Sequence, residues 1–220
     1  MLLGKRFNLL FILTGLVYLL LLPYRPFPLD ALVKVVPIGI LFFAAYAQLS
    51  GKLRTLVLLG IAFCGLGDVL LNLTFENSFI FGLGAFLIGH CFYIASFFSF
   101  ANRSNFIAKI LLIVIALVSV AGLALQILPK AGDLLIPVAA YMSVIATMGI
   151  FAVLSWRKTS TQIWGAVIFI ISDTLIAWGM FLEPVQYQGH WVMFTYYLAQ
   201  ILIVSGMLKL FTERQLNRFL

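Results

Sequence analysis

Residues 55–73 read TLVLLGIAFCGLGDVLLNL, an apolar run of membrane-spanning length that contains one carboxylate, Asp68. A helix that crosses the hydrocarbon core needs roughly 20 mostly apolar residues. A charged side chain at that depth is costly, and it usually serves binding, transport or catalysis. A second such run, IFIISDTLIAW at residues 168–178, contains Asp173. The two aspartates are therefore the first candidates for a functional site.

The rest of the chain has the same apolar character. It has 220 residues, of which 64% are hydrophobic and 10% charged, and its mean hydropathy is +1.14. No soluble domain of this length is so apolar, so we expect an all-α membrane protein. The predicted fold is one integral membrane domain, residues 1–220, with almost no room for a soluble domain. Its eight transmembrane helices are expected at residues 7–22, 30–49, 54–73, 78–101, 106–128, 133–155, 161–182 and 189–211.

Lysine and arginine gather on one side of this predicted topology. Eleven of the 14 lie at span ends that share a side, and they are Lys5, Arg6, Lys52, Arg54, Arg103, Lys109, Arg157, Lys158, Lys209, Arg214 and Arg218. Only Arg25 and Lys130 lie opposite, and Lys34 lies within a span. Because cytoplasmic loops carry an excess of lysine and arginine, both termini are expected in the cytoplasm. The net charge of +7 is then an orientation signal, and no nucleic-acid partner is expected.

Polar residues also indicate an internal duplication. The offset between matching residues drifts slowly along the chain: 103 for Asp30 and Asp133 and for Arg54 and Arg157, 105 for Asp68 and Asp173, and 107 for Glu76 and Glu183, for His90 and Tyr197 and for Tyr93 and Gln200. Asp30 and Asp133 are expected as helix N-caps. Candidate repeats are residues 1–104 and 105–220, two parallel four-helix units related by an axis along the membrane normal.

The predicted topology places the intramembrane polar residues in one layer, from the midplane to the outer third of the bilayer. This layer holds Lys34, Asp68, His90, Tyr93, Tyr141, Asp173, Tyr196, Tyr197 and Gln200. Residues that occurred at random would scatter across the membrane, so their convergence favours a site. Pro37 follows Lys34 and is expected to free a backbone carbonyl and bend that helix.

Each member of this layer also has a structural explanation. Lys34 could extend to the interface, and His90 could be a buried histidine of the bundle. Neighbouring helical residues point in different directions, so one of Tyr196 and Tyr197 is expected to face lipid. Asp68, Asp173 and His90 could form at most a minimal metal site, so neither a metal nor a cofactor is expected.

Small residues are expected to have packing roles. Both cysteines, Cys64 and Cys91, are expected to be buried within apolar runs. Glycines at residues 60, 65, 67, 82, 84 and 89 should let the third and fourth helices approach closely. No glycine-rich phosphate loop, GxSxG motif or CxxC motif is present.

An ordered set of segments resembles a known family. LVKVVP (32–37), FCGLGDVLL (63–71), FLIGHCFY (86–93), IPVAAYM (136–142), GAVIFIISDTLIA (165–177) and YYLAQILI (196–203) together are similar to the YhhN-like lysoplasmalogenase family of transmembrane proteins. The family commonly has a proline two residues before Pro37, where this chain has Val35. The resemblance covers nearly the whole chain.

This resemblance implies hydrolysis of the vinyl ether bond of lysoplasmalogens to a fatty aldehyde and a glycerophospho-head group. Protonation of the alkenyl carbon would give an oxocarbenium ion, which water captures. Such chemistry suits one carboxylic acid and one carboxylate, as in glycosidases. We expect Asp173 as the acid and Asp68 as the base. Lys34 and His90 are expected to hold the lipid phosphate, while Tyr93, Tyr141, Tyr196, Tyr197 and Gln200 orient the glycerol and water.

Two other functions fit the residues. Eight helices with a repeat and a buried lysine, aspartate and histidine also suit a proton-coupled transporter of small molecules or lipids. A non-catalytic lipid-binding or scaffold protein is the third possibility. A lysophospholipid substrate and the bilayer are the expected partners, with no obligate protein partner. The basic bias and short loops indicate a bacterial inner membrane, with the endoplasmic reticulum membrane as the alternative.

Overall fold

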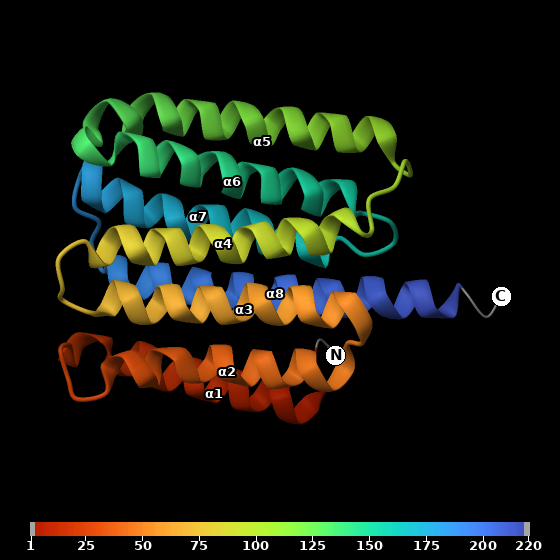
Figure 1. Cartoon of the computed structure of the whole chain (residues 1–220), viewed down its shortest axis with the longest axis horizontal. Coiled ribbons are helices and arrows are strands. Elements are labelled where there is room, and N and C mark those ends of the chain that lie inside the picture. Colours follow the sequence, from red (N-terminus) through yellow and green to blue (C-terminus); the bar gives the residue numbers. More distant parts are fainter. Residues whose placement is uncertain (1–2, 218–220) are drawn as a thin grey trace.

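Eight long helices make up a computed structural model that describes residues 3–217 (Figure 1). They are α1 (Lys5–Leu21), α2 (Asp30–Gln48), α3 (Gly51–Asn72), α4 (Ser78–Phe98), α5 (Phe106–Ile127), α6 (Leu135–Leu154), α7 (Thr161–Phe181) and α8 (Gln188–Leu216). Three short 3-10 helices, η1 (Leu22–Tyr24), η2 (Leu128–Lys130) and η3 (Gly132–Leu134), lie in the connections. All eight α-helices are long and apolar enough to cross a membrane, and residues 3–217 contain no strand.

Successive helices run in opposite directions, because the connections between them are short. Figure 1 shows the start of α1 and the end of α8 at the same end of the bundle. The α2–α3, α4–α5 and α6–α7 connections lie there too, with ten of the eleven basic residues predicted to share a side. We call this the basic end. The eleventh, Arg218, lies outside the described residues.

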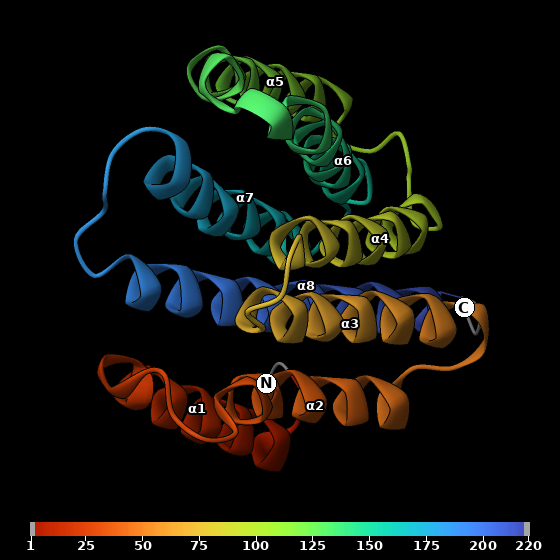
Figure 2. The same ribbon diagram turned by 60° about the vertical axis from the view of Figure 1, so that its left-hand side comes forward.

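The helices differ in how deeply they are embedded. α8 contacts α1, α2 and α7, and most of its length is buried (Figure 2). Its Tyr196 and Tyr197 are 3% and 4% exposed, so the expectation that one of them faces lipid is wrong. A central helix has neighbours on several sides, whereas a peripheral helix has one buried stripe. α5 is such a peripheral helix, with only Lys109 and Ile127 buried.

Glycines allow two helix pairs to pack closely, as expected for α3 and α4. A Cβ atom added at Gly60 would lie 2.5 Å from the Tyr93 ring, and one at Gly89 would lie 3.1 Å from the Gly60 carbonyl oxygen. α7 and α8 pack in the same way, since a Cβ at Gly165 would lie 2.7 Å from the Ile203 backbone nitrogen. Gly84, in contrast, has no neighbour within 4 Å of its added Cβ, so it plays no part in this packing.

Three local expectations are wrong. Asp30 is the first residue of α2 and makes no capping bond; its carboxylate instead pairs with Arg25 at 2.6 Å and accepts a bond from Tyr18 at 3.2 Å. Asp133 lies in η3, two residues before α6 begins. Cys64 is buried, but Cys91 is exposed, because it lies on the outward side of α4 while its neighbour His90 points inward.

Candidate active site

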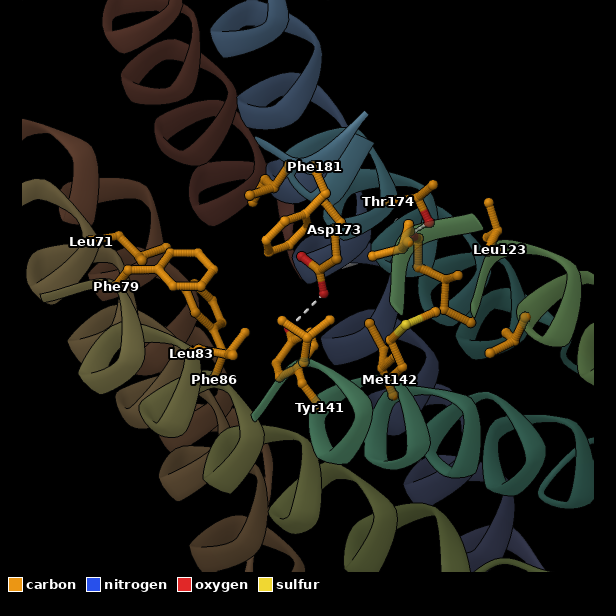
Figure 3. A pocket seen from close by; sticks show the side chains of 17 residues that line it. Leu71, Phe79, Leu83, Phe86, Leu123, Tyr141, Met142, Asp173, Thr174 and Phe181 are labelled. Atoms are coloured by element: carbon orange, nitrogen blue, oxygen red, sulfur yellow. Dashed lines mark hydrogen bonds between the residues drawn. The ribbon is translucent and has the colours of Figure 1, made fainter. Parts of the chain in front are cut away.

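Asp173 and Tyr141 form the polar part of an otherwise apolar cavity. α7 carries Asp173 and α6 carries Tyr141, whose hydroxyl donates a hydrogen bond of 2.6 Å to Oδ2 of Asp173 (Figure 3). The structure gives this carboxyl no cationic partner among the described residues. Burial of a charge without a counter-ion is costly, so this environment suits the neutral carboxylic acid.

The cavity beside this pair is narrow, with a volume of about 80 Å³. Side chains from α3, α4, α5, α6 and α7 line it, and nearly all are aliphatic or aromatic. Figure 3 shows Phe79, Leu83 and Phe86 on one side of the Asp173 carboxyl and Met142 on the other. A reacting group that enters this cavity therefore meets apolar side chains everywhere except at the Asp173–Tyr141 pair and at Thr174.

Asp68 is in a different environment. It lies on α3 and is 2% exposed, and its Oδ1 is 3.0 Å from the Nζ atom of Lys34 on α2. The same Nζ atom lies 3.4 Å from the Asp68 carbonyl oxygen. The Tyr196 hydroxyl is next to this carboxylate. However, neither that hydroxyl nor Oδ2 of Asp68 has a hydrogen-bond partner within the described structure. The ion pair suits the ionised form of Asp68.

An aromatic cluster connects the two aspartates. Asp68 is not among the residues that line the cavity. Phe86 does line it, and its ring packs edge-on against Tyr196 at 5.9 Å and Phe169 at 6.3 Å. Asp68 is nevertheless close enough to Asp173 for an electrostatic interaction. The two carboxyls thus belong to one buried layer, but only Asp173 faces the cavity.

His90 contacts the same cluster from α4. It is fully buried, and its Nδ1 lies 2.6 Å from the Phe86 carbonyl oxygen, so Nδ1 is the nitrogen that donates. Its ring packs edge-on against Phe169 at 4.6 Å and Tyr141 at 5.5 Å, and its Nε2 has no partner among the described residues. His90 therefore supports the wall of the site behind Tyr141.

The remaining predicted residues join helices. Tyr93 donates a 2.7 Å hydrogen bond to Oε1 of Gln200, which ties α4 to α8, and both residues are fully buried. Tyr197 donates a 2.7 Å bond to the Lys34 carbonyl oxygen, which ties α8 to α2. Pro37 has no backbone N–H, so the carbonyl oxygen four residues before it lacks its helical donor, and the bond from Tyr197 lies one residue beyond that carbonyl. These bonds fix α2 and α4, the helices that carry Lys34 and His90, against α8.

Residues 3–217 contain no cluster of three or more His, Cys, Asp or Glu side chains that could hold a metal ion.

The site residues that the sequence did not single out are Phe86 and Phe169, which connect the two aspartates. With 21 phenylalanines in the chain, no sequence pattern distinguishes these two.

Comparison with known proteins agrees with the resemblance. Lysoplasmalogenase TMEM86B of Sus scrofa is 32% identical over 205 residues, which span 91% of this chain and 85% of that protein. Lysoplasmalogenase TMEM86A of Homo sapiens is 31% identical, over 86% of this chain and 83% of that protein. A lysoplasmalogenase of Mycobacterium bovis is 30% identical, over 74% of this chain and 64% of that protein. No solved structure matches significantly. The YhhN family model matches residues 29–207, so this chain belongs to the YhhN family.

Proposed function

We propose that this protein is an intramembrane hydrolase that cleaves the vinyl ether bond of lysoplasmalogen. The observation that carries the proposal is the Asp173–Tyr141 pair, a hydrogen-bonded carboxyl at the wall of an apolar cavity between membrane-spanning helices. Family membership supports it, since curated relatives are named lysoplasmalogenases. The products would be a fatty aldehyde and a glycerophospho-head group.

Asp173 is the proposed acid. Tyr141 donates to Oδ2, which leaves Oδ1 to carry the acidic proton. That proton goes to the β-carbon of the alkenyl chain, and the electron pair of the double bond forms the new C–H bond. The result is an oxocarbenium ion and an Asp173 carboxylate. An apolar cavity favours this step because its hydrocarbon lining offers few other groups that could accept the proton.

Asp68 is the proposed partner carboxylate. Its charge lies close enough to act on Asp173 and on a cation formed there, and Lys34 keeps it ionised. In the second step water attacks the cationic carbon and loses a proton to a carboxylate, which gives a hemiacetal. We assign this proton to the Asp173 carboxylate, which faces the cavity, in place of Asp68, which does not line it. Asp68 then acts on the cation through its charge. The water proton thus restores the acid. In the collapse of the hemiacetal the C–O bond to glycerol breaks and the proton of the hemiacetal hydroxyl passes to the departing oxygen, which releases the aldehyde and leaves the glycerol hydroxyl.

The other predicted site residues take supporting roles in this proposal. Lys34 neutralises Asp68 and His90 packs behind Tyr141, so neither is assigned the lipid phosphate. Tyr93 and Gln200 hold α4 against α8. Tyr196 and Tyr197 complete the buried layer around Asp68.

The helix contacts support the proposed duplication. Within each half, each helix contacts the next, and the close α3–α4 pair has its counterpart in α7–α8. Between the halves, α4 contacts α6 just as α8 contacts α2. Each aspartate is bonded by a residue from the preceding helix of its own half, Lys34 for Asp68 and Tyr141 for Asp173. We propose two parallel repeats, residues 1–104 and 105–220. The equivalent helix pair carries an ion pair in the first repeat and a tyrosine–carboxyl pair in the second.

The charge distribution supports an orientation with the basic end in the cytoplasm. Both termini would then be cytoplasmic, and Asp173 would lie in the outer half of the bilayer. A bacterial inner membrane is the proposed location, with the endoplasmic reticulum membrane as the alternative. Cysteine accessibility at the α2–α3 and α3–α4 connections in intact cells tests the orientation.

The hydrolase is favoured over the transporter by the character of the Asp173 cavity. A transport path needs polar groups or helix breaks that continue towards both ends. The cavity is apolar apart from its tyrosine–carboxyl pair and one threonine, Thr174.

Purified protein in detergent, supplied with a 1-alkenyl lysophospholipid, tests the proposal through aldehyde release. We expect release by the wild type and none by Asp173→Asn. Alkyl-ether and ester lysolipids of equal chain length are the matched substrates and should give no aldehyde. Equal aldehyde release by Asp173→Asn would overturn the proposed role of this acid.

A further inference from the structure

A second, larger cavity adjoins the one at Asp173. It lies between α5, α6 and α7 and has a volume of about 410 Å³, within the range of small-molecule pockets. The two cavities share four lining residues, namely Val120, Leu123, Ile170 and Thr174. They therefore adjoin along these four side chains, with the narrow cavity at the Asp173 carboxyl and the wide one towards the basic end.

The length of the wide cavity matches one lipid chain. Its lining extends along α7 to Ile163, ten residues from Asp173. At about 1.5 Å per helical residue this is ~15 Å. The hydrocarbon core of a bilayer is about 30 Å thick, so ~15 Å is the depth that one leaflet's chains occupy.

The lining offers a ligand nothing but hydrocarbon contacts. Its only polar side chains are Ser119 and Thr174. Their hydroxyls donate to carbonyl oxygens of their own helices, to Ile115 at 2.8 Å and to Ile170 at 2.7 Å. A head group or a polar solute would find no partner in this space, whereas an aliphatic chain needs none.

We propose that this wide cavity binds the hydrocarbon chain of the substrate, with the reacting alkenyl end in the narrow cavity at Asp173. The proposal rests on the proposed function, and it names the chain-binding part of that site. A single-chain lipid fits because the wide cavity adjoins the narrow one and leads away from the acid in one direction. Chain length is then read by steric fit at the inner part of the cavity, where Gly149 of α6 is part of the wall.

Gly149 is the position for a test because it can be filled without disturbing backbone. A Cβ atom there would lie 3.3 Å from Cδ1 of Ile170, the free end of a flexible side chain. Gly149 lies five residues before the end of α6, and Asp173 lies twelve residues after the start of α7, at the same end of the bundle. The difference of seven residues places Gly149 about 10 Å from the level of Asp173 along the helices. Gly122 of α5 is the matched control: its added Cβ has no neighbour within 4 Å, and it lines neither cavity.

Gly149→Leu and Gly122→Leu are compared on octenyl and octadecenyl lysophospholipids by aldehyde release. We expect Gly149→Leu to lower kcat/KM about tenfold for the octadecenyl chain and to leave the octenyl chain unchanged, because only the long chain meets the new side chain. Gly122→Leu should resemble the wild type on both. An equal loss on both chains, no loss on either, or the same shift in Gly122→Leu would overturn the proposal.

A binding experiment separates this proposal from the proposed reaction and needs no variant. A saturated octadecyl-ether lysolipid with a diazirine at its chain end is photolysed with the wild-type protein, and labelled residues are identified by mass spectrometry. We expect labels on α6 and α7 between residues 149 and 153 and between 163 and 167. Labelling there, combined with no aldehyde release from the 1-alkenyl substrate in the separate assay, would leave the chain site standing and refute the reaction. Labelling spread over the lipid-facing surface would refute the chain site.

Discussion

Removal of the Lys34 charge should destabilise the protein far more than removal of an exposed lysine. Lys34 and Asp68 have only 9% and 3% of their side-chain surface exposed, and their charged atoms are 3.0 Å apart. Lys34→Met leaves the Asp68 carboxylate buried without a counter-ion, which costs about 3–5 kcal/mol. For a chain of this size each kcal/mol lowers Tm by roughly 2–4 °C, so the expected loss is about 6–20 °C.

The double variant Lys34→Met with Asp68→Asn should recover most of that loss. It removes both charges, so the free energy of unfolding should return to within about 1 kcal/mol of the wild type. Thermal unfolding of detergent-solubilised protein measures the single and the double variant beside the wild type. Lys52→Met is the control, since Lys52 is exposed at the basic end and should change Tm little. A loss below about 1 kcal/mol in Lys34→Met, or a double variant no more stable than the single one, would contradict the buried ion pair.

Two further variants test the packing and the acid. Gly60→Ala should lower the free energy of unfolding by about 1–3 kcal/mol, because its Cβ would lie 2.5 Å from the fully buried Tyr93 ring. Gly84→Ala, with open space around it, is the control and should not lower Tm. Equal Tm values for the two variants would contradict the close contact between α3 and α4. Tyr141→Phe removes the hydroxyl that holds the acidic carboxyl, so kcat should fall about 10- to 100-fold with Tm nearly unchanged; an unchanged kcat in the aldehyde assay would remove Tyr141 from the site.

The number and bounds of the helices could be predicted because hydropathy and chain breaks are local properties of the sequence. The observed ends agree with the predicted ones within about three residues except at the end of α8, which extends to Leu216, five residues beyond the predicted end at residue 211. The positive-inside pattern needed no structure either. Each of these features depends on residues that lie close together along the chain.

Contacts between helices could not be predicted in the same way. Depth in the membrane placed Asp68 and Asp173 in one layer, but it did not show that Lys34 pairs with one and Tyr141 with the other. Depth says nothing about the direction a side chain takes around its helix. For that reason His90 was a phosphate-binding candidate by sequence, and its ring contacts with Phe169 emerged only from the packing.

The central claim is that Asp173 donates a proton to the alkenyl carbon. Hydrolysis in deuterium oxide tests it directly, because the transferred proton stays in the aldehyde at the carbon next to the carbonyl. We expect one deuterium at that carbon, a solvent isotope effect on kcat, and loss of both aldehyde and label in Asp173→Asn. Aldehyde release by Asp173→Asn with the same label and the same isotope effect would contradict the account.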